Sequence, residues 1–423
     1  MNRPEKKEVR KPVSVCLVGI GGMGQSYLKA LLNEFSPRQV RISAVIEPSP
    51  KNLVDALDLQ KRGIPVLSNL QTFYRSGQST DLVVICSPIH HHVPQACEAL
   101  ENGSYVLCEK PIGATIQEAL HLIRTKDSAH QWVMIGYQWS YSRAIQSLKK
   151  HVLSGRFGRP IRLKTLCFWP RHQAYYQRND WAGKIKIRGK WVLDSPANNA
   201  MAHFLHNLFY ILGERADRSA MPHEVKAELY RVYPIENYDT AACRAYTKEG
   251  FELLYYASHA VSVNKGPMFS FEFEEATVTY GDSIDETVAR DRKGNESLYG
   301  DPESEHPLRK LFEAVAAVQK PKPILCGPEA ALAQTLCINA MQESAPEIRT
   351  FPESLIHRDS DEKRWFAKGL DRALYECYIK GILPSEAKLS WACAGKQVSL
   401  ENYRYFPGGE QPITQTAVDK EKE

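Results

Sequence analysis

The sequence has 423 residues, of which 43% are hydrophobic and 24% charged, and its formal net charge is +5. A chain of this length exceeds one ordinary core and predicts two domains. Basic and acidic residues are interleaved, so the mild positive excess does not indicate a nucleic-acid-binding protein. No apolar run approaches the roughly 20 residues that a membrane-spanning helix needs, and the amino terminus lacks the apolar core of a secretory signal. We therefore expect a cytoplasmic protein that binds neither nucleic acid nor membrane.

A strand, a glycine-rich turn and a helix open the first predicted domain, after a flexible leader at residues 1–12. Residues 13–18 form a near-continuous apolar run, as a buried parallel strand requires, and a helical pattern follows the turn. Such a turn binds a dinucleotide because its glycines permit a tight bend, close approach of the pyrophosphate and close packing of the helix. The expected cofactor contacts are Gly19, Ile20, Gly21, Gly22, Met23 and Gly24.

The next predicted strand, residues 40–46, ends in a carboxylate. Glu47 stands 23 positions after Gly24 (47 − 24), near the spacing of roughly 20 that is expected for an acid that binds the ribose hydroxyls. Because a carboxylate there repels a 2′-phosphate, the sequence favours NAD over NADP. Lys51 and Asn52 lie just beyond and soften that preference.

A third buried strand, residues 81–86, leads into three consecutive histidines, residues 90–92. Adjacent residues in a loop rarely converge on one ion, and no Cys, Asp or Glu pattern accompanies them, so no metal site is predicted. We expect one histidine to pack near the cofactor or to cap the helix that begins near Val93. The cofactor-binding candidates in this stretch are Ser87, Pro88, His90 and His92.

The stretch at residues 105–115, YVLCEKPIGAT, reads as a short buried strand followed by an acid, a base and a rigid turn. In an open parallel sheet, ligands bind at the carboxyl ends of the strands. Glu109 and Lys110 are therefore expected at a ligand site.

Four motifs together resemble the Gfo/Idh/MocA family of NAD(P)-dependent oxidoreductases: GIGGMG, SPIHHH, ALENGSYVLCEKPIGAT and the Gly136-Tyr137 pair after a further strand. The resemblance implies that Glu109 and Lys110 lie near the nicotinamide and that the Lys110–Pro111 bond is cis. It also adds Gln138 to the cofactor-binding candidates and Tyr137 to the substrate-binding candidates.

The second half predicts an α+β domain with a large, mainly antiparallel open sheet, behind an N-terminal Rossmann dinucleotide-binding domain. A helix at 144–153 and a strand at 161–168 are followed, up to about Tyr280, by short alternating runs. In the family that this chain resembles, one face of such a sheet carries helices and the other is often buried between subunits, which implies a homodimer or homotetramer. We place the first domain at residues 13–137 and the second at 138–350.

The segment at residues 169–191 mixes aromatic and charged side chains and predicts a substrate lid. Aromatic faces stack on sugar rings, while charged forks bind hydroxyls or carboxylates. The substrate-binding candidates here are Arg171 and Trp181. An ordinary surface excursion is the alternative interpretation.

A helix from His203 to Gly213 resembles the family helix that carries the catalytic histidine, so His203 is matched to that residue. Two features depart from the family pattern: Asp194 lies nine positions before His203 (203 − 194), and His206 stands where a second aspartate is usual. Asp194, Asn199 and His206 are kept as substrate-binding candidates. Asn198 is an alternative to Asn199, Asn207 can replace the missing aspartate, and a structural role remains open for both histidines.

A long helical pattern at residues 329–344 closes the second domain, and residues 351–423 predict an appendage packed on the body. Within it, Trp365, Phe366, Leu370, Leu374 and Tyr375 predict a helix, and residues 398–406 predict an edge element before a charged tail.

Hydride transfer from a secondary alcohol needs a base for the hydroxyl proton and a positive group for the developing oxyanion. The resemblance assigns these roles to His203 and Lys110. We expect an NAD-dependent dehydrogenase of a sugar, an inositol or a related polyol. The alternatives are an NAD-dependent glycoside hydrolase, which oxidises its substrate only transiently, and a catalytically silent dinucleotide-binding sensor.

Overall fold

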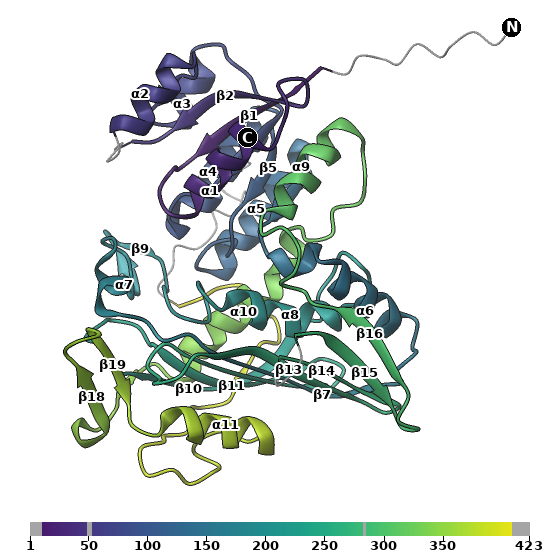
Figure 1. Cartoon of the computed structure of the whole chain (residues 1–423), viewed down its shortest axis with the longest axis vertical. Coiled ribbons are helices and arrows are strands. Elements are labelled where there is room, and N and C mark those ends of the chain that lie inside the picture. The colour runs from purple at the N-terminus through teal and green to yellow at the C-terminus, as the bar shows by residue number, and fades with distance from the viewer. Residues whose placement is uncertain (1–10, 49–52, 282–284, 408–423) are drawn as a thin grey trace, which may run out of the picture.

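The computed structural model describes residues 11–48, 53–281 and 285–407 (Figure 1). Most of the predicted leader, together with Lys51, Asn52 and the charged tail from residue 408, lies outside the described residues. The predicted limits of the domains stay predictions.

The first sheet has six parallel strands in the order β3-β2-β1-β4-β5-β6. Their bounds are β1 Val13–Val18, β2 Val40–Ile46, β3 Val66–Leu67, β4 Leu82–Ile85, β5 Tyr105–Cys108 and β6 Val133–Ile135. The connecting helices are α1 Met23–Asn33, α2 Leu53–Lys61, α3 Leu70–Arg75, α4 Ile89–Glu101 and α5 Ile116–Ala129. The strand order reverses between β1 and β4, and ligands bind outside the carboxyl ends of the strands at such a point. The predicted Rossmann fold is confirmed.

The helix after β4 begins earlier than predicted. α4 starts at Ile89 with Pro88 as its N-terminal flanking residue, and it continues through Pro94. The three histidines at 90–92 therefore lie on the first turn of a helix, and the prediction of a loop there was wrong. Pro94 is the sixth residue of this helix and lies in its interior, where it leaves one backbone hydrogen bond unmade.

The second sheet is mixed and mainly antiparallel, as predicted. Its path is β16-β15-β14-β13-β7-β12-β11-β10-β17, with β20 paired to β10. Only β7 with β12 and β10 with β17 run parallel among the described strand pairs of this sheet. The bounds are β7 Pro160–Phe168, β10 Pro222–Arg231, β11 Thr240–Thr247, β12 Glu252–Ser258, β13 Lys265–Phe273, β14 Ala276–Tyr280, β15 Thr287–Asp291, β16 Glu296–Gly300, β17 Arg349–Thr350 and β20 Val398–Ser399.

Helices cover one face of this sheet and connect it to the first domain (Figure 1). They are η1 Gln138–Tyr141, α6 Arg143–Leu153, α8 Ala202–Ile211, α9 Arg309–Gln319 and α10 Pro328–Ser344. α8 packs on β7, and α10 packs on β10 and on α5. α9 contacts β1 and β5 of the first sheet, so a late segment of the chain completes the first domain.

The appendage covers part of the opposite face of the large sheet (Figure 1). It consists of η2 Glu353–Leu355, the hairpin β18 Ile356–Asp359 and β19 Arg364–Ala367, and α11 Leu370–Lys380. Leu370 and Leu374 pack there with Leu166, Leu254 and Tyr256 in a second apolar core. Trp365 and Phe366 lie in a strand, so the prediction that they belong to the helix was wrong, whereas the predicted edge element is present as β20.

Ion pairs on the same face lie against the appendage, where Lys164 donates to the carbonyl of Ile379 and Arg244 to that of Gly381. Arg162 pairs with Glu252 at 2.5 Å, Lys164 with Glu272 at 3.4 Å, and Arg244 with Glu252 at 2.8 Å. No helix among the described residues is both long enough and apolar enough to span a membrane.

Candidate active site

The glycine turn after β1 has the geometry that a pyrophosphate requires. A Cβ on Gly24 would lie 2.0 Å from the carbonyl oxygen of Gly19, so only glycine permits this contact between helix and turn. Gly19 has φ +81° and Gly22 has φ +51°, in the region that favours glycine. A Cβ on Gly21 would meet no atom within 4 Å. Open space over the backbone at the start of α1 fits a bound dinucleotide phosphate.

Glu47 reaches the same turn from the end of β2. Its Oε2 accepts a hydrogen bond of 3.2 Å from the backbone N–H of Ile20. The carboxylate predicted to bind the ribose thus lies beside the predicted pyrophosphate site.

The stretch after β4 is partly buried. Ser87 donates its hydroxyl proton to Gln95 at 2.6 Å, and the His92 ring lies 2.8 Å from the carbonyl of Ser87 and 2.7 Å from that of Pro111. Burial lowers the pKa of His92 and lowers that of His90 to about 4. Through its two contacts, His92 links the segment after β4 with the segment after β5. Among the described residues, no group of three or more His, Cys, Asp or Glu side chains is arranged to hold a metal ion.

Glu109 lies in a buried charge network at the end of β5. Its Oε1 accepts from the Tyr27 hydroxyl at 2.6 Å and from the Lys310 ammonium, which also donates to the carbonyl of Gly136 at 2.9 Å. Burial raises the pKa of Glu109, but Lys310, Lys110 and the hydrogen bonds oppose that effect and bring the pKa below its usual value. Glu109 is therefore an ionised carboxylate fixed by α1 and α9.

Lys110 follows, and its bond to Pro111 is cis, as predicted. The Lys110 ammonium donates to the backbone oxygen of Asn199 at 2.7 Å and to its side-chain oxygen at 3.3 Å. Asn199 in turn donates to Oδ1 of Asp194 at 2.7 Å. The structure thus brings together three predicted site residues, Lys110, Asn199 and Asp194.

The pKa of Lys110 is lowered to about 8. Burial is the largest cause; Lys310 and Arg178 act in the same direction, and Glu109 and Asp194 oppose them. A lysine with this pKa exchanges a proton near neutral pH and remains largely charged below pH 8.

His203 lies on the first turn of α8 and is 8% exposed. Burial lowers its pKa well below the usual value, and the charges of Lys110, Lys310 and His206 add to this effect. Its ring meets the Tyr137 ring edge-on at 5.9 Å, and its Nδ1 has no hydrogen-bond partner among the described residues. A neutral imidazole beside a lysine ammonium suits proton transfer.

His206 and Tyr137 are packed inside the protein, and neither presents surface to a ligand in this conformation. Their rings stack at 4.0 Å, and His206 bonds Ser140 at 2.9 Å. Asn198 and Asn207 are also buried, and Asn198 donates to the carbonyls of Val192 and Leu193. Asn199 is thus the asparagine of this stretch that reaches Lys110.

The segment after β7 places charged and aromatic side chains beside Asp194. It contains α7 Gln173–Gln177 and the hairpin β8 Lys186–Ile187 with β9 Lys190–Trp191. Figure 1 shows α7 and β9 on the side of the large sheet that faces the first domain. The Arg178 guanidinium lies 3.7 Å from Asp194 and 5.2 Å from the centre of the Trp181 ring. Arg171 lies 5.7 Å from the Trp169 ring.

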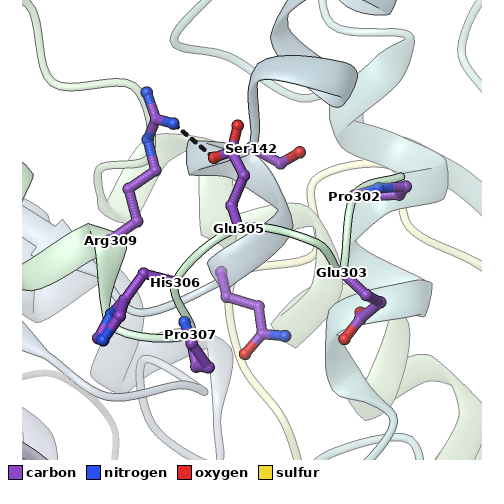
Figure 2. Close-up of a pocket in the computed structure, with 8 residues that line it drawn as sticks. Ser142, Pro302, Glu303, Glu305, His306, Pro307 and Arg309 are labelled. Carbon is purple, nitrogen blue, oxygen red and sulfur yellow. Dashed lines mark hydrogen bonds and ion pairs between the residues drawn. The ribbon is translucent and has the colours of Figure 1, made fainter. Parts of the chain in front are cut away.

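Gln138 lines a hollow together with the residues labelled in Figure 2, which are Ser142, Pro302, Glu303, Glu305, His306, Pro307 and Arg309. Arg309 bonds Glu305 at 2.5 Å within the hollow, His306 lies 3.2 Å from Glu34 outside it, and Glu303 accepts from the Trp139 ring N–H. Gln138 lies on η1, which packs against the helix α8 that carries His203.

Comparison with known proteins now bears on this geometry. Residues 13–137 match the GFO_IDH_MocA family model, described as an oxidoreductase family with an NAD-binding Rossmann fold. The first domain of the chain thus matches the Gfo/Idh/MocA oxidoreductase family. Inositol 2-dehydrogenase of Corynebacterium glutamicum is 28% identical over 159 residues, which are 37% of this chain and 45% of that protein. The match therefore spans about half the length of this relative.

Solved structures of low sequence identity have the same fold. WlbA dehydrogenase from Bordetella pertussis, in complex with NADH and UDP-GlcNAcA, has a TM-score of 0.65 and 20% identity over 80% of this chain and 97% of that one. Aldose-aldose oxidoreductase from Caulobacter crescentus has a TM-score of 0.63 and 17% identity over 79% and 98%.

Sequence reasoning missed two residues of this candidate site, Lys310 and Tyr27, which both donate hydrogen bonds to Glu109. Lys310 lies on α9, for which the sequence analysis predicted no helix. The helical spacing of the buried residues in α9 was a usable signal. Lys310 falls on the same face as Leu311, Ala314 and Ala317, and all four are buried. A lysine on the apolar face of a helix indicates a buried acidic partner.

Proposed function

We propose that this protein transfers a hydride between NAD and a secondary alcohol of a sugar, an inositol or a related polyol. The observation that carries the proposal is the position of Lys110: its ammonium is bound to Asn199 at the ligand edge of an NAD-binding sheet and acts electrostatically on a buried, neutral His203. These are the base and the positive group that alcohol oxidation requires.

Each residue has a defined part in this proposal. The NAD nicotinamide, when bound, accepts the hydride. His203 takes the hydroxyl proton, because its low pKa keeps the imidazole neutral. Lys110 donates two of its three N–H bonds to Asn199, and the third is directed to the substrate oxygen. Asp194 orients Asn199 and so positions Lys110.

Relatives support this assignment. The matched proteins include inositol 2-dehydrogenases of Corynebacterium glutamicum and Burkholderia multivorans, and the structural neighbours include levoglucosan dehydrogenase with NADH. Each of those names is that of a dehydrogenase of an inositol or a sugar derivative. Glu47, beside the glycine turn, supports NAD over NADP.

The proposal includes a cytoplasmic homodimer or homotetramer. Because α11 and the segment after it cover Lys164 and Arg244 on the outer sheet face, a subunit interface on that side would include the appendage. Light scattering on the purified protein measures the oligomeric state.

The test is a screen of inositols, polyols, sugars and sugar acids with NAD and NADP, followed by NADH absorbance. We expect oxidation of at least one compound with NAD. Lys110→Ala and His203→Ala should each lower kcat by about 100- to 10,000-fold, the usual contribution of an acid–base group. Turnover within a few fold of the unmodified protein in both variants would contradict the assigned roles.

A further inference from the structure

Two arginines converge on one tyrosine in the segment that precedes Asp194. The guanidinium carbon of Arg178 lies 3.8 Å from the centre of the Tyr175 ring, and that of Arg171 lies 4.9 Å from it. Both arginines lower the pKa of the buried His259 ring, for which burial is the larger cause. The two cations thus share a neighbourhood that burial and aromatic rings keep partly dry.

This arginine pair connects to the proposed reaction centre from two directions. Arg178 lies 3.7 Å from Asp194, which bonds the Asn199 that holds Lys110. On the other side, the Trp169 ring lies beneath Arg171 and packs edge-on against the Phe204 ring at 5.3 Å. Phe204 directly follows His203 in the chain. A ligand that contacts the arginine pair is therefore within electrostatic reach of Lys110, on which Arg178 itself acts.

The charges of this cluster do not balance. Arg171 and Arg178 contribute +2 and Asp194 contributes −1, which leaves an excess of +1. Among the described residues, Arg171 has no carboxylate partner, and its buried Nε has no acceptor. Asp239 lies near Tyr176, but its carboxylate already accepts the N–H groups of Val232 and Tyr233.

We propose that Arg171 and Arg178 bind a carboxylate of the substrate, so that the sugar or polyol oxidised here is an acid. This inference rests on the proposed function and narrows its substrate class. A guanidinium presents paired donors that match the two oxygens of a carboxylate. A single negative charge neutralises the excess of +1 and leaves Lys110 for the oxyanion that develops on the alcohol, whereas a phosphate dianion overcompensates it.

The first experiment measures binding rather than turnover. Calorimetry compares D-glucuronate with D-glucose, D-galacturonate with D-galactose, and each uronate with the corresponding 6-phosphate, on protein saturated with NADH. No alcohol is oxidised under these conditions, so the result stands even if the protein catalyses no oxidation. We expect a uronate to bind about 10- to 100-fold more tightly than its neutral parent, the range for hydrogen bonds to a charged group. Equal binding of acid and parent for both pairs, or tighter binding of a phosphate, would overturn the proposal.

The second experiment assigns the effect to the arginines. Arg171→Gln and Arg178→Gln should each remove most of the preference for the acid without changing the affinity for the neutral parent, and Arg171→Lys should restore part of it. Arg188→Gln is the matched control, because Arg188 lies on the same segment with a side chain that is 89% exposed. Thermal unfolding verifies that each variant is folded. Loss of affinity for acid and parent alike in folded Arg171→Gln and Arg178→Gln would contradict the assigned role.

Discussion

The two sides of the candidate site differ in how their charges are held. On the side of β5, Glu109 is bonded by Tyr27 and Lys310, whose side chain is 1% exposed. On the side of the segment at 169–191, Arg178 is 28% exposed and Arg171 has no carboxylate partner among the described residues. In the function proposed above, the body of the protein therefore fixes the groups for proton and hydride chemistry, whereas the groups that choose a substrate lie on a connection between strands. Enzyme folds commonly divide scaffold and specificity in this way.

The largest expected effect is on the side of β5, at the buried pair of Glu109 and Lys310. Lys310→Met leaves the Glu109 carboxylate buried without its cation, and breaking a buried pair on one side costs about 3–5 kcal/mol of stability. Urea unfolding at pH 8 measures the loss. Lys322→Met is the matched control, because Lys322 pairs with Glu313 of the same helix α9 but both side chains are partly exposed; exposed pairs contribute about 0–1 kcal/mol.

The pH dependence of that loss has a defined sign. In the unmodified protein the pKa of Glu109 is depressed, so its contribution is present above the unfolded pKa and is lost as the pH falls through the folded pKa. In Lys310→Met, burial dominates and raises the pKa of Glu109, so this variant loses stability as the pH rises. The difference between the two proteins should therefore shrink from pH 8 to pH 5. A difference that is constant over this range would show that Lys310 acts only through packing.

The buried pair also shows what the sequence could not predict. Strand β1, the glycine turn and α1 are continuous in the chain, so a single stretch of sequence carries their whole signal. Lys310 and Glu109 are 201 residues apart, and the period of a helix does not say which sheet it will cover. The second domain's helix α9 packs on the first domain's sheet, which only the folded chain reveals.

Two local errors have local causes. Trp365 and Phe366 suit a strand and a helix equally, but Gly369 adopts φ +73° and separates β19 from α11. Glycine in that conformation interrupts regular structure, so the Lys368-Gly369 pair was the signal that the helix begins at Leu370. His90 to His92 were assigned to a loop before a helix that begins near Val93, whereas the helix begins at Ile89, directly after Pro88.

The second prediction concerns Lys110, where the two sides meet. Its pKa of about 8 results from burial and from Glu109, Lys310, Asp194 and Arg178 together. The charged form is present below this pKa and is lost above it, so kcat/KM should fall about tenfold per pH unit well above pH 8. Arg178→Gln should raise the pKa at which kcat/KM begins to fall, because it removes a positive charge near Lys110. Asp194→Asn should lower that pKa, because it removes a negative charge. If neither substitution shifts this pKa, Arg178 and Asp194 have no electrostatic effect on the reaction centre.

The third prediction concerns Glu47, which lies beside the glycine turn where NAD is expected to bind. Glu47→Gln removes the charge that repels a 2′-phosphate while it keeps an oxygen for the Ile20 N–H. We expect the ratio of kcat/KM for NAD to that for NADP to fall about tenfold, which corresponds to about 1.4 kcal/mol. Initial rates at matched concentrations of the two cofactors measure the ratio. An unchanged ratio would show that other residues near the ribose, beyond Glu47, exclude the phosphate.

The smallest expected effect lies at the start of α5, which follows the stretch that carries Glu109 and Lys110. The backbone N–H of Glu118 donates to the Thr115 hydroxyl at 3.5 Å, while the Glu118 carboxylate accepts the N–H groups of Ala114 at 3.0 Å and Thr115 at 2.8 Å. Thr115→Ala removes one half of this reciprocal cap and should cost about 1 kcal/mol in urea unfolding. Thr125→Ala, within the same helix, is the control and should be close to neutral, because alanine is the better helix former. A cost for Thr115→Ala as large as that for Lys310→Met would mean that the cap, and not the buried ion pair, holds Glu109 and Lys110 in place.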